Sequence, residues 1–142
     1  MTTWTFPLAS MAFMASATAL STHAADLSID VSTPAGRQGA VLAAVFDRAD
    51  GFPRGKPLQT ATATLVDGKA LVQFTGLPDG DYAVSAFLDE NANMKLDANL
   101  FGLPTEPYGF SRDARALAGP PAFADAAIRL DASTARQTIT LK

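Results

Sequence analysis

Short stretches of alternating apolar and polar residues run through most of the chain after residue 26. In the first, LSIDVS at residues 27–32, leucine, isoleucine and valine alternate with serine and aspartate. A period of two places every second side chain on the same face of a β-strand. The apolar runs are short and separated by Gly, Pro or Asp, so the pattern predicts an all-β domain with at most one short helical turn, at 113–117.

The pattern predicts seven strands. Residues 39–46, GAVLAAVF, are apolar on both faces and are predicted to form a central strand. Residues 60–66 and 70–74 are predicted to form a hairpin around Asp67-Gly68, a dipeptide that accepts the positive φ of a tight turn. The other predicted strands are 27–32, 82–88, 122–130 and 136–141. Seven short strands in one domain of this length indicate a single seven-stranded Greek-key β-sandwich.

The segment 89–121 is a long connection between two of these strands. Connections of that length without regular structure are usually functional or disordered. This one is rich in large apolar side chains, which favour burial over disorder. They are Leu96, Leu100, Phe101, Leu103, Tyr108, Phe110 and Leu117. The sequence therefore predicts one long ordered loop with these side chains packed against the sandwich.

The first 24 residues contain no Asp, Glu, Lys or Arg and form an apolar stretch that ends in Thr-His-Ala. This pattern predicts a signal peptide, residues 1–24, cleaved near Ala24 to leave a single β-sandwich domain, residues 25–142. A transmembrane anchor is disfavoured because Pro7 and several Ser and Thr residues interrupt the apolar run. We expect a periplasmic or secreted protein with no membrane insertion after cleavage.

Composition excludes several classes of function. The chain has a net charge of −3 and scattered basic residues, which argues against a nucleic-acid partner. It has no cysteine, and its only histidine, His23, lies in the predicted leader. A mature chain without His or Cys has no Ser-His-Asp or Cys-His nucleophile and no typical zinc site. We expect a protein that is not an enzyme.

The stretch DENANMKLD has oxygen-bearing side chains at regular spacing. Asp89, Asn91, Asn93 and Asp97 occupy its positions 1, 3, 5 and 9, and the carbonyl of Lys95 is at position 7. These are the oxygen-donor offsets of an EF-hand type of loop, and Ca²⁺ prefers carboxylate, amide and carbonyl oxygens. The stretch predicts a calcium site that would stabilise the long loop.

Two positions depart from that pattern. Position 6 is Met94 where the sharp turn normally has glycine, and position 12 is Leu100 where a bidentate glutamate would lie. Asn99 or Glu106 is the candidate replacement ligand, and a site of this charge would bind in the range of about 10⁻⁴ to 10⁻³ M. The alternative is a solvated turn in which Asp and Asn side chains bond their own backbone without a metal.

Four segments follow one another within residues 76–130: GLPDGDYAV, DENANMKLD, GLPTEPYGFS and GPPAFADA. In their order and spacing they resemble a family of short exported bacterial proteins called domain of unknown function 2141. The resemblance implies an exported transthyretin-like or immunoglobulin-like sandwich and no established activity. Members of the family usually have glycine where this chain has Met94.

The segment PYGFS and the two arginines after it form a candidate partner surface: Glu106, Tyr108, Phe110, Arg112 and Arg115. Rings supply apolar area and arginine supplies bidentate contact to a carboxylate, which suits an unknown protein or glycan partner. In the alternative interpretation the two rings pack the loop onto the sandwich while an arginine neutralises Glu106 or Asp113.

Two further functions remain open from the sequence. Asp89, Glu90, Asp97 and Glu106 could supply the carboxylate pair of a hydrolase acting on glycans. A structural subunit of a cell-surface assembly would use the edges of the sheets instead of the loop. The leading expectation is a non-enzymatic binding module whose long loop forms the recognition surface.

Overall fold

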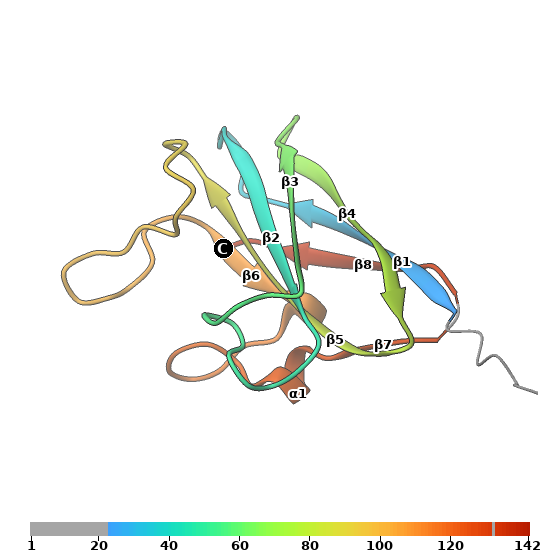
Figure 1. The fold of residues 1–142 in the computed structure, drawn as a ribbon. Coiled ribbons are helices and arrows are strands. Elements are labelled where there is room, and N and C mark those ends of the chain that lie inside the picture. The colour runs from blue at the N-terminus through green and yellow to red at the C-terminus, as the bar shows by residue number, and fades with distance from the viewer. Residues whose placement is uncertain (1–22, 132) are drawn as a thin grey trace, which may run out of the picture.

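Two β-sheets pack face to face in the computed structural model, which describes residues 23–131 and 133–142 (Figure 1). The smaller sheet has the order β4-β1-β8, with β1 at Ala24–Ser32, β4 at Lys69–Pro78 and β8 at Ala135–Thr140. The larger sheet has the order β3-β2-β5-β6, and β7 also pairs with β5. Its strands are β2 Ala40–Phe46, β3 Gln59–Thr64, β5 Gly80–Asp89, β6 Tyr108–Phe110 and β7 Ile128–Leu130. The prediction of an all-β sandwich is confirmed.

The core lies between the sheets and is built from alternate residues of their strands. Leu27, Ile29 and Val31 of β1 are buried, as the alternation in the sequence predicts. The inward residues of β5 are Tyr82, Val84, Ala86 and Leu88. The strand β2 is central, between β3 and β5, because both of its faces carry apolar side chains.

The end of the chain connects the two sheets. The strand β8 runs parallel to β1, and the N–H of Leu141 then donates to the carbonyl of Ser32. Lys142 exchanges two backbone hydrogen bonds with Tyr108 of β6, both of 3.1 Å. Gly109 permits this approach, since a Cβ there would lie 2.9 Å from Cγ2 of Ile139.

The described residues form eight strands instead of the predicted seven. The additional strand, β6, lies inside the predicted long loop and is followed by a short 3-10 helix, η1, at Ser111–Asp113, not by the turn predicted at 113–117. The strand predicted at 122–130 is wrong in its first part, which forms a helical turn, α1, at Phe123–Ala126. Its last three residues form β7.

The predicted hairpin around Asp67-Gly68 is wrong beyond its turn. The two residues have φ of +50° and +74°, and Val66 bridges to Lys69 as expected of a tight turn. After that bridge, β3 joins the larger sheet and β4 joins the smaller one. The two strands diverge because the inward residues of β4, such as Val72 and Phe74, are buried opposite the larger sheet.

A second apolar cluster covers one end of the outer face of the larger sheet. Ala83, Phe110 and Ala126 are its buried members, and Phe52 packs against them from the loop 47–57. The ring of Phe52 makes edge contacts with the rings of Phe46, Phe110 and Phe123 at centroid distances of 5.3 to 5.9 Å. This cluster anchors the loop that follows β2 over the sheet.

Ser111 fills a gap in the pairing of β5. The strand β7 pairs with β5 at residues 80–82 and β6 pairs with it at residues 85–87. Between them, the buried hydroxyl of Ser111 accepts a hydrogen bond of 2.9 Å from the N–H of Val84. It donates its own hydrogen to the carbonyl of Ala126. One side chain thus joins β5 to α1.

The predicted signal peptide lies almost entirely outside the described residues, which begin at His23. The strand β1 starts at Ala24, where cleavage is predicted. Within residues 23–131 and 133–142, no helix has both the length and the apolar character needed to cross a membrane.

Candidate functional site

The acidic loop, residues 89–97, starts at the last residue of β5. Asp89 is buried, and its carboxylate accepts two backbone hydrogen bonds from the loop that follows it. The N–H of Asn93 lies 3.2 Å from Oδ1, and the N–H of Met94 lies 2.8 Å from Oδ2. The side chain at the first position of the loop therefore fixes the backbone of its centre.

Three further side chains of the acidic loop contact one another directly. Oδ1 of Asn91 accepts the N–H of Asn93 at 3.2 Å, and Oδ1 of Asn93 accepts the N–H of Lys95 at 2.9 Å. The amide nitrogens of both asparagines donate to the carboxylate of Asp97, that of Asn93 at 2.8 and 3.0 Å. Residues 89, 91, 93 and 97 thus form one hydrogen-bonded unit.

The sharp turn expected at position 6 of the acidic loop is present without glycine. Met94 has φ of +63°, in the left-handed region that glycine normally occupies. Its side chain is 67% exposed, so packing does not hold the residue in this conformation. The hydrogen bond from its N–H to Asp89 is the contact that fixes the turn.

Glu106 joins the two ends of the acidic loop. Its side chain is buried, and Oε1 accepts the N–H of Glu90 at 2.9 Å. Oε2 accepts the N–H of Asp97 at 3.0 Å, and the carbonyl of Asp97 accepts the N–H of Thr105 at 2.8 Å. The loop is closed as a ring by a carboxylate that lies nine positions beyond its end.

Residues 98–104 form a second turn outside this ring. Oδ1 of Asn99 accepts the N–H groups of Phe101 and Leu103, and Ala98 bridges to Pro104. The prediction that the apolar residues of the long loop are buried is wrong here. Leu100 is 103% exposed and Phe101 87%, because the turn bonds to itself and projects beyond the sandwich. Leu96, Leu103 and Leu117 are also exposed.

A groove of about 630 Å³ lies on the outer face of β2, β5 and β6. Ala44 and Ser85 lie opposite each other in adjacent strands and form its floor. These small side chains are flanked by larger ones, which leaves a hollow in the sheet surface. The flanking residues are Phe46, Phe87, Tyr108 and Phe110.

Three loops form the walls of this groove. They are the loop after β2 (residues 53–57), the end of the acidic loop with the turn that follows it (residues 96–104) and the segment before α1 (residues 119–120). Figure 1 shows the loops that follow β2, β5 and β6 projecting on the side of the larger sheet that faces away from the smaller one. The long loop thus supplies two of the three walls.

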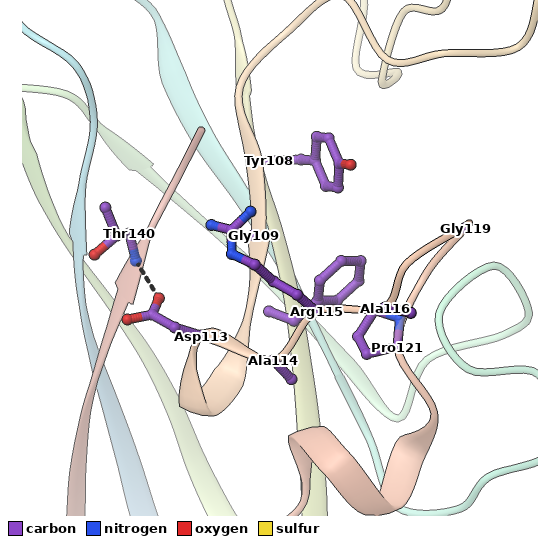
Figure 2. Close-up of a pocket in the computed structure, with 10 residues that line it drawn as sticks. Tyr108, Gly109, Asp113, Ala114, Arg115, Ala116, Gly119, Pro121 and Thr140 are labelled. Atoms are coloured by element: carbon purple, nitrogen blue, oxygen red, sulfur yellow. Dashed lines mark hydrogen bonds between the residues drawn. The ribbon is translucent and has the colours of Figure 1, made fainter.

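A smaller hollow of about 80 Å³ adjoins the groove and shares Tyr108, Phe110 and Gly119 with it. Figure 2 shows Arg115 extended alongside β6, with its guanidinium directed toward Gly109. The N–H of Thr140 donates to Oδ1 of Asp113 at 2.8 Å in the same view. A hollow of this size holds no more than a few water molecules.

A family model described as an uncharacterized protein conserved in bacteria (DUF2141) matches residues 29–138. The chain belongs to the DUF2141 family. The resemblance found in the sequence is thereby confirmed and extends over most of the domain. Comparisons with curated proteins and with solved structures found no match.

In this DUF2141 chain the predicted metal ligands are brought together in part. Asp89, Asn91, Asn93 and Asp97 form the hydrogen-bonded unit, and Lys95 adds its N–H to that unit. Among the described residues, no group of three or more His, Cys, Asp or Glu side chains is placed to hold a metal ion. The predicted set consists mostly of amide and carbonyl oxygens, from Asn91, Asn93 and Lys95, so the calcium site stays a prediction.

The predicted partner surface is divided between the interior and the exterior of the DUF2141 domain. Glu106 is buried because its carboxylate bonds the loop backbone, and Phe110 is buried in the second apolar cluster. Tyr108 is half-buried at the groove, while Arg112 and Arg115 are exposed. No ion pair between described residues joins either arginine to Glu106 or Asp113.

The carboxylates considered for a hydrolase are engaged in the DUF2141 fold. Asp89 and Glu106 each accept two backbone hydrogen bonds, and Glu90 pairs with Arg37 at 2.8 Å. A general acid or nucleophile must reach the substrate, and burial against backbone donors removes two of these groups from solvent. No observation here favours the hydrolase alternative.

Sequence reasoning missed the groove. Its floor comes from two strands that were assigned only to the core, and one wall comes from residues 53–57, which lie outside every predicted strand. A signal was present in the β2 segment, where both faces are apolar although one of them lies outside the sandwich. An apolar outward face next to a Pro-rich loop indicates that the loop folds over the sheet.

Proposed function

We propose that this protein is an exported, non-enzymatic β-sandwich that binds a small ligand in the groove over β2, β5 and β6. The observation that carries the proposal is the groove, whose volume of about 630 Å³ lies within the roughly 300–1,000 Å³ of small-molecule sites. Its lining is mostly apolar, as in such sites. Export is supported by the uncharged, apolar first 24 residues.

The fold type is part of this proposal. An immunoglobulin-like or transthyretin-like Greek-key arrangement is supported by two facing sheets whose first two strands belong to different sheets. In sandwiches of this kind the loops carry recognition while the sheets supply a rigid frame. The groove uses both, since strands form its floor and loops its walls.

The acidic loop positions one wall of the groove. Its last residue, Asp97, is bonded through its N–H to Glu106 and through its carbonyl to Thr105. The wall residues Leu96 and Ala98 are its neighbours in the chain. Because this wall is already ordered, ligand binding does not carry the entropic cost of ordering it. The hydrogen-bonded ring is thus proposed to preorganise the groove.

A weak calcium site in the acidic loop is the second part of the proposal. The side chains of Asp89, Asn91, Asn93 and Asp97 and the carbonyl of Lys95 would supply oxygen ligands of the kind Ca²⁺ prefers. It is supported by the proximity of these side chains: both asparagines contact Asp97 through Nδ2, and on binding their amides would turn Oδ1 toward the ion. Binding would restrict the loop further and stabilise the fold by mass action.

The groove is tested with a neutral, apolar fluorescent dye such as N-phenylnaphthylamine. Emission should rise on addition of the protein, and the Ala44→Leu and Ser85→Leu variants, which fill the floor, should abolish the rise. Thr62→Leu is the matched control, because Thr62 is exposed on β3 outside the groove. Equal dye binding by the wild type and by the Ala44→Leu and Ser85→Leu variants would show that the groove is not a binding site.

The calcium part is tested by thermal unfolding of chelator-treated protein with and without millimolar Ca²⁺. The melting temperature should rise with Ca²⁺ in the wild type and stay unchanged in Asp97→Asn. Asp50→Asn is the control, because Asp50 is an exposed acid outside the acidic loop. The absence of a rise in the wild type would leave the hydrogen-bonded ring as the only order in the loop.

A further inference from the structure

The groove contains few polar side chains. Its lining carries a side-chain nitrogen or oxygen at Arg54, Ser85 and Tyr108, and the other lining residues are apolar or glycine. A site of this composition recognises an apolar body and orients it through a small number of polar contacts. The chemistry of those polar side chains therefore indicates which functional group lies at one end of the ligand.

Arg54 is the charged residue among them. It makes no hydrogen bond or ion pair with any described residue, whereas Arg37, Arg48, Arg129 and Arg136 are each paired with a carboxylate. Arg112 and Arg115 are likewise unpaired with described residues, but they lie outside the groove lining. In the same loop Asp47 is engaged by Arg48 at 3.1 Å, and the exposed Asp50 lies outside the groove lining. An unpaired guanidinium at the edge of an apolar groove suits an anionic group, above all a carboxylate.

The walls disfavour a peptide as the ligand. A bound peptide needs backbone donors and acceptors in its site, because its own amide groups lose water on binding. Four of the wall residues are prolines, Pro53, Pro57, Pro104 and Pro120, which have no N–H group. The floor strands β2 and β5 are paired on both sides and have no free edge. An alkyl chain needs none of these contacts.

The entrance of the groove is apolar as well. Leu96 and Leu103 line the groove and are 38% and 61% exposed. Leu100 and Phe101 project from the same turn into solvent. Together these four side chains continue the apolar surface from the groove to the tip of the turn, so a chain longer than the floor would still meet apolar contacts.

We infer that the groove binds a free, single-chain anionic amphiphile of the fatty-acid class, with the alkyl chain over Ala44 and Ser85 and the carboxylate at Arg54. This inference rests on the proposed function of the groove and adds the class of ligand. The alkyl chain supplies affinity through burial, and each added methylene should tighten binding about fourfold until the groove is filled. Arg54 supplies the preference for an anion.

The test is isothermal titration of the whole protein with dodecanoate and with dodecanol, both below their aggregation concentrations. Dodecanoate should bind more tightly than dodecanol by up to about fivefold, the upper end expected for an exposed ion pair. Arg54→Gln should remove that preference. Lys56→Gln is the matched control. It also removes one positive charge, two residues along the chain, but the side chain of Lys56 does not line the groove.

Each outcome bears on a different part of the inference. Equal affinity for dodecanoate and dodecanol, or an equal effect of Arg54→Gln and Lys56→Gln, would overturn the anionic class while the groove itself stands. Binding to anionic phospholipid vesicles without binding to free dodecanoate would overturn the single-chain ligand. If the wild-type protein binds neither the neutral dye nor either amphiphile, the proposed function itself is rejected. Thermal melts of each variant show that it is folded.

Discussion

The carboxylate of Glu106 accepts a hydrogen bond from the backbone N–H of Asp97, with 3.0 Å between Oε2 and the nitrogen. Its other oxygen holds the N–H of Glu90 at 2.9 Å, so a single buried side chain closes the acidic loop. The loop in turn fixes one wall of the groove. The stability of the fold and the shape of the groove thus both depend on this residue.

Replacing Glu106 with glutamine should lower the free energy of unfolding by about 2–3 kcal/mol. The variant keeps one carbonyl oxygen but turns an NH₂ group toward the second N–H, which loses a hydrogen bond to a buried charged acceptor. Urea unfolding measures the change. Glu90→Gln is the control, since its exposed pair with Arg37 should contribute no more than about 1 kcal/mol. Similar losses in both variants would contradict the role of Glu106.

Gly39→Ala should be among the most destabilising single changes, at about 3 kcal/mol or more from strain and overpacking together. Gly39 has φ of +138°, and a Cβ there would lie 2.3 Å from the carbonyl oxygen of Asp89. Gly36→Ala separates the two causes, because Gly36 has φ of +80° but no atom within 4 Å of its Cβ position. Thermal unfolding of both variants should show a clearly smaller loss for Gly36→Ala.

Ser111→Ala should cost about 2 kcal/mol, because the buried N–H of Val84 and the carbonyl of Ala126 both lose their partner. The matched control is Ser85→Ala, whose hydroxyl makes no hydrogen bond to a described residue. Amide hydrogen exchange at Val84 gives a local reading beside the global unfolding curve. Unchanged protection at Val84 would show that another acceptor replaces the hydroxyl.

Stability should fall at alkaline pH through Tyr82. Burial raises the pKa of this phenol, with smaller contributions from Asp47 and Asp79. The fold therefore favours the neutral form. Its contribution is complete below the unfolded pKa of about 10 and is lost as pH rises through the folded value.

The comparison for this prediction is Tyr82→Phe. It removes the hydrogen bond of 2.6 Å from the hydroxyl to the carbonyl of Pro78, so it should be less stable than the wild type at neutral pH by about 1 kcal/mol. The gap should close as pH rises above about 10, where the wild type loses stability and the variant does not. Unfolding curves from pH 8 upward test this, and parallel pH profiles would refute it.

Met94→Gly should stabilise the protein by up to about 1 kcal/mol, because glycine adopts the left-handed conformation without the penalty of a side chain. Met94 is largely exposed, so little packing is lost. If the loop holds Ca²⁺ in the conformation described, the melting temperature of the variant should still rise with calcium. A destabilised variant would mean that the entropy of glycine in the unfolded chain outweighs the strain.

The period of two in the sequence was sufficient to predict most of the core. In LSIDVS and in the segment from Tyr82 to Leu88, one face meets the other sheet, so burial and alternation coincide. The strands β6 and β7 have three residues each, too short to show a period. The turn between β3 and β4 does not predict that the two strands join different sheets, because a tight turn fixes only its own local geometry.

The acidic loop was predicted from its spacing because its contacts are local. Asp89, Asn93 and Met94 interact within five positions of one another, a separation that sequence reasoning handles well. Glu106 was considered as a metal ligand or a surface group. Its hydrogen bonds to Glu90 and Asp97 form only because the long loop folds back onto the acidic loop, which the sequence does not show. The groove joins residues from three separate segments, so only the assembled fold reveals it.

The parallel pairing of β1 with β8 links the two most distant strands of the domain; Asp30 and Arg136, which bond across it, are 106 positions apart. A contact of such high sequence separation forms late, since most of the chain must collapse before the two segments meet. Refolding from denaturant should therefore be slow for a domain of this size. A truncated chain that lacks the last strand should remain trapped as an aggregation-prone intermediate.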